Sequence, residues 1–250
     1  MRLLILGGTT EAIGLGRALA ADERFQAVMS LAGRTRYPAA QPLPVRLGGF
    51  GGAEGLAEYL TRERIDAVID ATHPFAIQIS GNAVAAASAT GTQLLTLLRP
   101  EWHPLQGDRW TLVATIAEAA QALGAVPSRV LLTVGRGELG PFATAPWHHY
   151  VIRSVDPPHP DILPPDACVV TARGPFDEAG EYLLLNEHRI EVLVSKNAGG
   201  DATVAKLHAA RALGVPVVMV SRPAKPAGDV VASVSAALAW LHDRLPPRGA

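Results

Sequence analysis

The chain has 250 residues with a net charge of −1 at neutral pH, and 48% of the residues are hydrophobic. This composition provides enough apolar side chains for a sizeable core, which excludes general disorder, and the length allows one large α/β domain or two small ones. A charge so close to zero produces no global attraction to nucleic acid or to an anionic membrane, so neither partner is expected.

The apolar runs are too short for a membrane span or a secretion signal. None approaches the ~20 residues that a spanning helix requires, and the apolar start, residues 1–6, is interrupted by glycine. The single cysteine, Cys168, lies in the apolar run 167–170 and is interpreted as a core residue. A cytoplasmic protein is therefore expected.

The first predicted element is a buried strand, residues 3–6, which turns sharply into a helix over residues 12–21. The turn carries two glycines and two threonines: Gly7, Gly8, Thr9 and Thr10. Glycines let the backbone approach a phosphate, hydroxyls can donate to it, and the free N–H groups of a helix start face the same point. The match to G-x-G-x-x-G is imperfect, because Thr9 replaces the second glycine. A nucleotide phosphate site and a plain turn without a ligand are both compatible with this pattern.

The second apolar run, residues 26–31, is followed by Gly33, Arg34 and Arg36. At this point of a dinucleotide-binding fold, an acidic residue accepts a hydrogen bond from the ribose of NAD, whereas an arginine accommodates the 2′-phosphate of NADP. No acidic residue stands here. The sequence therefore favours NADP, with exposed loop arginines as the alternative.

A further strand, predicted at residues 67–70, continues into Thr72 and His73. Ligands of open α/β sheets bind at the carboxyl ends of the parallel strands. We therefore expect Thr72 and His73 in the same crevice as the two glycines of the first turn. His73 could equally cap the helix predicted over residues 75–90.

The alternation of strands and helices continues to the end of the chain. Further strands are predicted at residues 94–98, 110–113, 130–134, 150–155, 168–172, 191–195 and 215–220, with a last helix at 231–244. The alternation restarts after the stretch 124–128. The prediction is an α/β protein with two Rossmann-like domains whose parallel sheets face across a cleft: residues 1–126 bind NADP and residues 127–250 form the substrate side.

Basic residues stand at or near the ends of six predicted strands: Arg99, Arg136, Arg153, Arg173, Lys196 and Arg222. Arginine and lysine are the usual partners of carboxylates and phosphates, so the set predicts an acidic ligand. For any one of them alone, a solvated surface charge is the alternative. No Cys/His cluster has the spacing of metal ligands, so no metal site is predicted.

Four segments in order resemble the precorrin-6A reductase family of cobalamin biosynthesis. They are LGGTTEA at residues 6–12, DATHPFA at 70–76 with Ile79-Ser80 and Asn82-Ala83 after it, RPEW at 99–102, and SKNAGG at 195–200. The resemblance covers most of the chain. It implies an NADPH-dependent reductase with two Rossmann-like domains and an active site between them, which transfers hydride to one double bond of precorrin-6A and yields precorrin-6B.

The resemblance also implies roles for individual residues. The cofactor phosphates would be held by Gly7, Gly8, Thr9 and Thr10, and the 2′-phosphate by Arg34. Thr72 and His73 would lie near the nicotinamide ribose, and three residues would approach from the second domain: Lys196, Asn197 and Gly199. Lys196, His73 and water are the candidates for the proton donor.

The implied substrate is an anionic tetrapyrrole that carries acetate and propionate groups. Each buried carboxylate without a partner would be costly, and we expect the strand-end cations to be these partners: Arg99, Arg136, Arg173, Lys196 and Arg222. The protein would be a monomer or a small homo-oligomer, with neighbouring enzymes of the pathway as further partners.

Three other functions stay open. The substrate could be the cobalt-containing form of precorrin-6A, with the metal arriving inside the substrate. The protein could be an NADP-dependent reductase or epimerase of another small substrate, although the Tyr-x-x-x-Lys pair typical of such enzymes is absent from the sequence. It could also be a silent NADP-sensing regulator, which would have no evident need for the second-domain cations.

Overall fold

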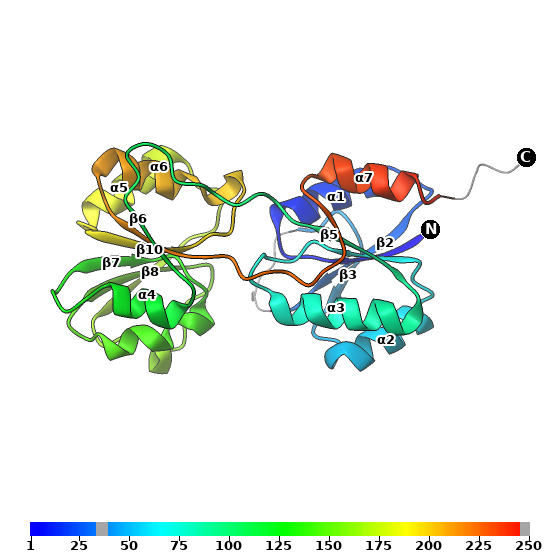
Figure 1. Ribbon diagram of the computed structural model, residues 1–250, viewed down its shortest axis with the longest axis horizontal. Coiled ribbons are helices and arrows are strands. Elements are labelled where there is room, and N and C mark those ends of the chain that lie inside the picture. Colours follow the sequence, from blue (N-terminus) through cyan, green and yellow to red (C-terminus); the bar gives the residue numbers. More distant parts are fainter. Residues whose placement is uncertain (34–39, 246–250) are drawn as a thin grey trace, which may run out of the picture. The chain divides into compact units, whose positions relative to one another are not determined.

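The alternating pattern of the sequence produces two α/β units, each built on a parallel sheet (Figure 1). The computed structural model describes residues 1–33 and 40–245. Unit 1 comprises Met1–Pro100 and Pro223–Ala250, and unit 2 comprises Glu101–Arg222. The prediction of two Rossmann-like α/β domains with parallel sheets is confirmed.

Unit 1 has the strand order β12-β5-β4-β1-β2-β3. The strands are β1 (Arg2–Leu6), β2 (Gln26–Leu31), β3 (Val45–Leu47), β4 (Ala67–Asp70), β5 (Gln93–Leu97) and β12 (Asp229–Val231). The helices are α1 (Thr10–Ala20), α2 (Gly52–Arg62), α3 (Ile77–Thr90) and α7 (Val234–His242). In Figure 1, α1 and α7 lie on one face of this sheet, and α2 and α3 lie on the other.

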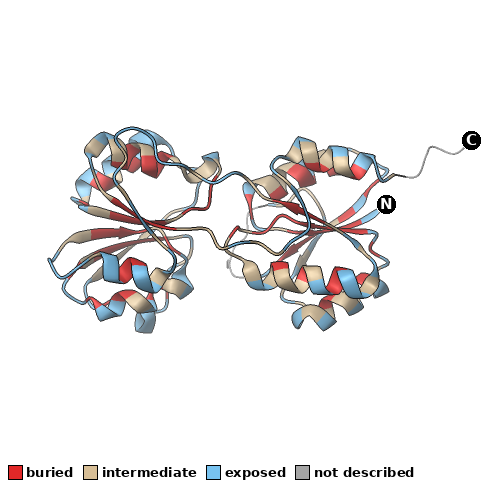
Figure 2. Cartoon of the chain, in the orientation of Figure 1, coloured by how far each residue is buried: buried red, intermediate tan, exposed pale blue. Residues whose placement is uncertain are grey.

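The core of unit 1 explains why its central strands are continuous apolar runs. Leu3 and Ile5 of β1 pack in one cluster with α1 and α7. Leu4 and Leu6 pack in the other cluster with α2 and α3. Successive side chains of a strand point to opposite faces, and here both faces are covered by helices. Figure 2 shows the resulting buried strands between partly exposed helices.

Unit 2 has the strand order β6-β11-β10-β7-β8-β9. The strands are β6 (Trp110–Val113), β7 (Arg129–Leu132), β8 (His149–Ser154), β9 (Ala167–Thr171), β10 (Val192–Lys196) and β11 (Val217–Val220). The α-helices are α4 (Ile116–Ala122), α5 (Glu178–Glu187) and α6 (Ala205–Leu213). Short 3₁₀ segments lie in the loops that follow β7, β8 and β10: Arg136–Glu138, Gly140–Thr144, Pro160–Ile162 and Asp201–Thr203. Leu131, Leu193 and Met219 of the sheet pack in one cluster with Leu185 of α5 and Leu207 of α6. In the part of the chain that the structure describes, no helix has the length and apolar character needed to cross a membrane.

The observed division differs in two places from the boundary predicted between residues 126 and 127. β6 and α4 belong to unit 2, where β6 pairs with β11. β12 and α7 return to unit 1, where β12 pairs with β5 and Leu241 enters the core. The correction has a physical reason. Both sheets are parallel and have an edge that can accept a strand, and a local pattern does not say which edge a strand will join.

Candidate functional site

The turn after β1 forms the start of α1. The side chain of Thr9 caps the helix, because its Oγ1 accepts a hydrogen bond from Ala12 N at 3.1 Å. The same hydroxyl donates to Ala71 O at 2.8 Å, after the end of β4. The structure therefore brings the turns after β1 and β4 side by side, as the sequence predicted.

The two glycines of this turn are required for different reasons. A Cβ on Gly7 would collide with Sδ of Met29, and Gly7 N donates to Ser30 O at 2.9 Å. Gly7 thus leaves room for the buried side chain of Met29 of β2 beneath the turn. Gly8 has φ +115°, a conformation that favours glycine, and no heavy atom lies within 4 Å of a Cβ built on it. Of the two, Gly8 faces the open space.

The start of α1 offers donors that fit a phosphate group. The first N–H groups of a helix have no acceptor within the helix, and Thr9 supplies an acceptor to one of them. The N–H groups of Thr10 and Glu11 stand in this first turn, where the helix dipole also favours an anion. The carboxylate of Glu11 would oppose an anion, but Arg99 Nη1 lies 2.6 Å from Glu11 Oε2. The turn therefore fits the phosphates of a nucleotide.

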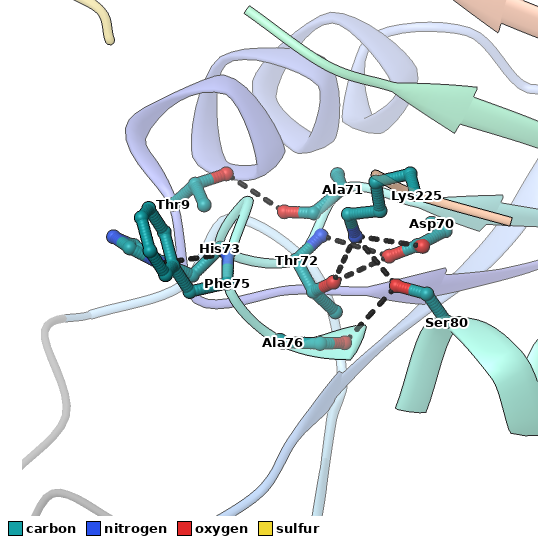
Figure 3. A network of polar contacts seen from close by, with 9 residues as sticks. All are labelled: Thr9, Asp70, Ala71, Thr72, His73, Phe75, Ala76, Ser80 and Lys225. Atoms are coloured by element: carbon teal, nitrogen blue, oxygen red, sulfur yellow. Dashed lines mark hydrogen bonds and ion pairs between the residues drawn. The ribbon is translucent and has the colours of Figure 1, made fainter. Parts of the chain in front are cut away.

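A buried polar network lies beneath the turn that follows β4 (Figure 3). Thr72 donates to Asp70 Oδ1 through both its backbone N, at 3.1 Å, and its Oγ1, at 2.6 Å. Lys225 Nζ lies 3.0 Å from Asp70 Oδ2 and donates to Thr72 Oγ1 at 3.0 Å and to Ser80 Oγ at 2.5 Å. The side chains of Lys225 and Asp70 are only 4% and 2% exposed. The chain has therefore buried a complete ion pair next to the predicted cofactor turn.

His73 stands at the bend between Thr72 and α3. Its Nδ1 accepts a hydrogen bond from Phe75 N at 3.3 Å, and its ring lies 5.8 Å from that of Phe75, centroid to centroid (Figure 3). The helix itself begins at Ile77 without a side-chain cap. His73 thus orders the turn before α3 rather than the first turn of the helix.

The turns after β10 and β7 of unit 2 are joined by an ion pair. Lys196 Nζ donates to Glu138 Oε1 at 2.9 Å and to Oε2 at 2.7 Å. Glu138 Oε2 also accepts from Gly135 N at 2.8 Å. The carboxylate therefore holds the ammonium of Lys196 in a fixed place at the carboxyl end of the sheet.

The side chain of Asn197 is used within unit 2. Its Oδ1 accepts from Trp102 N and its Nδ2 donates to Trp102 O, both at 2.9 Å, and the residue is 5% exposed. Trp102 Nε1 donates to Gly200 O at 3.0 Å. Asn197 therefore anchors the chain where it enters unit 2. Gly199, in the same loop, has φ +67°, a conformation that favours glycine over other residues.

Three of the predicted cations follow neighbouring strands of unit 2. Arg222 comes after β11, Lys196 ends β10, and Arg136 comes after β7. Arg222 donates to Asn197 O at 3.3 Å and to Ala198 O at 3.0 Å. Arg136 Nη1 lies 3.9 Å from Asp156 Oδ2, with 43% of its side chain exposed. These three cations therefore lie at the carboxyl ends of the strands, where ligands of open parallel sheets bind.

The other predicted cations lie elsewhere. Arg99 belongs to unit 1, with Glu11, and Arg173 is exposed after the edge strand β9. Arg153 lies within β8 and forms a buried ion pair with Glu181 at 2.5 Å. Arg34 and Arg36, predicted at the 2′-phosphate, lie outside the described residues.

Two features of the strand ends were missed from the sequence. Lys225 has no local motif, because its partners lie about 150 positions earlier in the chain. Arg46 of β3 donates to Gly48 O at 2.6 Å and to Gly49 O at 2.7 Å, and its guanidinium lies 3.8 Å from the centroid of the Phe50 ring. The glycine run after Arg46 was the available signal that this loop is ordered by a nearby side chain.

Cys168 has no catalytic setting in the structure. Burial raises the pKa of its thiol, so the thiol stays protonated at neutral pH and is a poor nucleophile. It packs against the core of unit 2 from β9. The observation agrees with the expected core role.

Comparison with known proteins identifies the family. Residues 2–242 match the family model described as precorrin-6x reductase CbiJ/CobK. The precorrin-6A reductase of Rhodobacter capsulatus is 53% identical over 249 residues, 99% of both chains, and that of Rhodococcus erythropolis is 50% identical over 96% of this chain and 97% of the relative. The cobalt-precorrin-6A reductase of Priestia megaterium is 27% identical over 68% of this chain and 70% of the relative. A solved structure of CobK precorrin-6A reductase has a TM-score of 0.94 and 52% identity over the whole of both chains. The chain therefore belongs to the precorrin-6x reductase family CbiJ/CobK and is an oxidoreductase.

Proposed function

We propose that the protein reduces one double bond of metal-free precorrin-6A with NADPH and yields precorrin-6B in cobalamin biosynthesis. The observation that carries the proposal is the 53% identity to a precorrin-6A reductase over 99% of both chains. The cobalt-precorrin-6A reductases among the relatives are 26–29% identical, which favours the metal-free substrate. The cobalt form is the alternative that the assay below distinguishes.

The cofactor is assigned to the strand ends of unit 1. Gly8, Thr9 and Thr10 hold its phosphates against the start of α1, where the backbone N–H groups and the helix dipole favour anions. Gly7 acts indirectly, because it leaves room for the side chain of Met29 beneath the turn. Arg34 is assigned to the 2′-phosphate. When bound, the nicotinamide supplies the hydride.

The turn after β4 is assigned to the nicotinamide ribose. Thr72 is 8% exposed and its hydroxyl is fixed by Asp70 and Lys225, so it can orient a neighbouring group without rearranging. His73 is held by Phe75 N. A positioned donor is the main contribution that a protein makes to hydride transfer, since the chemistry belongs to the cofactor.

The carboxylates of the macrocycle are assigned to the cations of unit 2. Lys196, Arg136 and Arg222 follow three neighbouring strands, and Arg173 follows the edge strand β9. Arg99 was predicted in this group, but its contact with Glu11 supports a role on the cofactor side. Asn197 and Gly199 support the Lys196 loop from within.

The proton that completes the reduction is assigned to Lys196 or His73, with water as the third source. The ammonium of Lys196 is a proton donor in a fixed position, since Glu138 accepts two of its hydrogen bonds.

The test is a reduction assay with the purified protein. NADPH is mixed with metal-free precorrin-6A, then with the cobalt form, and NADH replaces NADPH in a parallel series. The expected result is rapid loss of nicotinamide absorbance with the metal-free substrate and NADPH, and a product heavier by two hydrogens. Oxidation with the cobalt form alone would assign the protein to the other branch, and no oxidation with either would refute the proposal.

A further inference from the structure

Lys225 enters unit 1 from the segment that returns from unit 2. It lies three positions after Arg222, the last residue of unit 2, and 155 positions after its partner Asp70. Its Nζ has three acceptors: Asp70 Oδ2, Thr72 Oγ1 and Ser80 Oγ (Figure 3). An ammonium has three N–H donors, so these contacts satisfy it completely.

The three acceptors lie at the two ends of one turn, residues 71–76. Asp70 and Thr72 mark its beginning, and Ser80 stands in the first turn of α3, where its hydroxyl donates to Ala76 O at 3.1 Å. Lys225 therefore connects the last residue of β4 to the start of α3. His73 lies between these two anchored ends, directly after Thr72.

The ammonium also holds the Thr72 hydroxyl from the side opposite Asp70. A hydroxyl has one hydrogen, and that of Thr72 is donated to Asp70 Oδ1 while its oxygen accepts from Lys225. Without Lys225, Asp70 would keep a buried charge with no cation, and the Thr72 hydroxyl would keep its bond to Asp70 but lose the donor that fixes it from the other side. The position of the turn thus depends on a residue from the far end of the chain.

Stability alone does not account for this arrangement. A buried ion pair is offset by the desolvation of both charges, and an apolar pair of similar size is often as stable or more so. A buried charge network does, however, fix one geometry where an apolar pair would allow several.

We propose that Lys225 is a positioning residue of the reductase, which clamps both ends of the 71–76 turn and so places Thr72 and His73 toward the nicotinamide end of the cofactor. The inference rests on the proposed function, in which this turn contacts the cofactor. Lys225 itself touches neither cofactor nor substrate in this assignment.

The experiment compares Lys225→Met with the double variant Lys225→Met/Asp70→Asn. Methionine has a similar length and no charge, so the single variant leaves Asp70 as an uncompensated buried charge and lowers the melting temperature. Asparagine removes that charge and keeps an oxygen for Thr72, so the double variant regains most of the melting temperature. A role in stability alone predicts that activity and cofactor affinity return with it.

The positioning role predicts a different outcome for the double variant. NADPH affinity, measured by the fluorescence of the bound nicotinamide, and kcat stay about 10- to 100-fold below wild type, while KM for precorrin-6A is unchanged. Hydrogen exchange of residues 71–76 without cofactor is faster than in wild type in both variants. A double variant with wild-type exchange, NADPH affinity and kcat would overturn the inference.

Lys206→Met is the matched control, because Lys206 is a buried lysine of unit 2 whose Nζ donates to Thr203 O at 2.7 Å. This variant should lose stability but keep wild-type NADPH affinity at a temperature at which it is folded. The failure of the proposed function would be visible separately, as a wild-type protein that oxidises NADPH with neither form of the substrate.

Discussion

Arg99 Nη1 lies 2.6 Å from Glu11 Oε2, so a cation from the end of β5 neutralises the acid in the first turn of α1. The two side chains are 13% and 21% exposed, which limits screening by solvent. Together they leave the helix start with its backbone donors and without a net negative side chain. An anion that binds at the start of α1 therefore meets less electrostatic repulsion from Glu11.

The Glu11–Arg99 pair leads to a prediction on cofactor affinity. Arg99→Met should weaken NADPH binding by about 10-fold, or about 1.4 kcal/mol, because the Glu11 carboxylate would then repel the phosphates. The double variant Arg99→Met/Glu11→Gln should regain most of the affinity. Fluorescence titration of NADPH measures both. If the double variant binds as weakly as the single one, Arg99 contacts the ligand itself.

Gly8 provides a prediction on the phosphate turn. Gly8→Val should destabilise the protein by about 1–3 kcal/mol, because a β-branched residue is strained at φ +115°. It should also abolish measurable NADPH binding, since the new side chain would fill the open space before α1. The control is Gly91→Val, at φ +68° after α3, which imposes a similar strain away from the site. Equal NADPH affinity in the two folded variants would remove Gly8 from the phosphate site.

Lys196 is predicted to act on the substrate side. Lys196→Met should lower kcat about 10- to 100-fold and leave the dissociation constant of NADPH within about two-fold. Arg109→Met is the control, because Arg109 precedes β6, at the opposite ends of the strands, and donates to Gly214 O. Steady-state kinetics and cofactor titration separate the two effects. Unchanged turnover in the Lys196 variant would exclude this assignment.

Tyr150 leads to a prediction on alkaline stability. Burial raises its pKa to about 12, and its hydroxyl donates to Phe142 O and Ala145 O. The folded protein holds the phenol proton more tightly than the unfolded chain, whose tyrosine pKa is about 10. The resulting stabilisation is complete below pH 10 and is lost as the pH rises toward 12.

Tyr150→Phe tests this relationship. At neutral pH the variant should be less stable by about 1–3 kcal/mol, since two buried carbonyl groups lose their donor. Between pH 10 and 12, its free energy of unfolding should fall less steeply than that of the wild type. Denaturant unfolding at several pH values measures both slopes, and parallel slopes would show that Tyr150 does not titrate in this window.

The sequence predicted the elements that depend on local patterns. The apolar run before Gly7 and the run before Asp70 became adjacent parallel strands, and the Thr9–Ala71 hydrogen bond confirms that their turns meet. Strand alternation and turn residues are local properties, so they can be recognised from a few neighbouring residues.

The pairing of charges was not predictable in the same way. Arg99 was expected to contact substrate, but its partner Glu11 lies 88 positions earlier in the chain. Lys225 carries no local signal, since nothing around it in the sequence indicates that it is buried beside Asp70. Side chains that meet only in the folded structure leave no local signal, and strand β12 was missed for a related reason: its three residues stand before a helix and pair only with distant β5.

The return of β12 and α7 to unit 1 has a consequence for biosynthesis. Leu241 and Ala237 complete a core whose other members are made before residue 100, so that core stays open while the ribosome adds unit 2. Unit 2, by contrast, is continuous and can close as soon as Arg222 has emerged. The domain that begins the chain is therefore the last to finish folding, and a fragment ending at residue 100 would lack an edge strand and a covering helix.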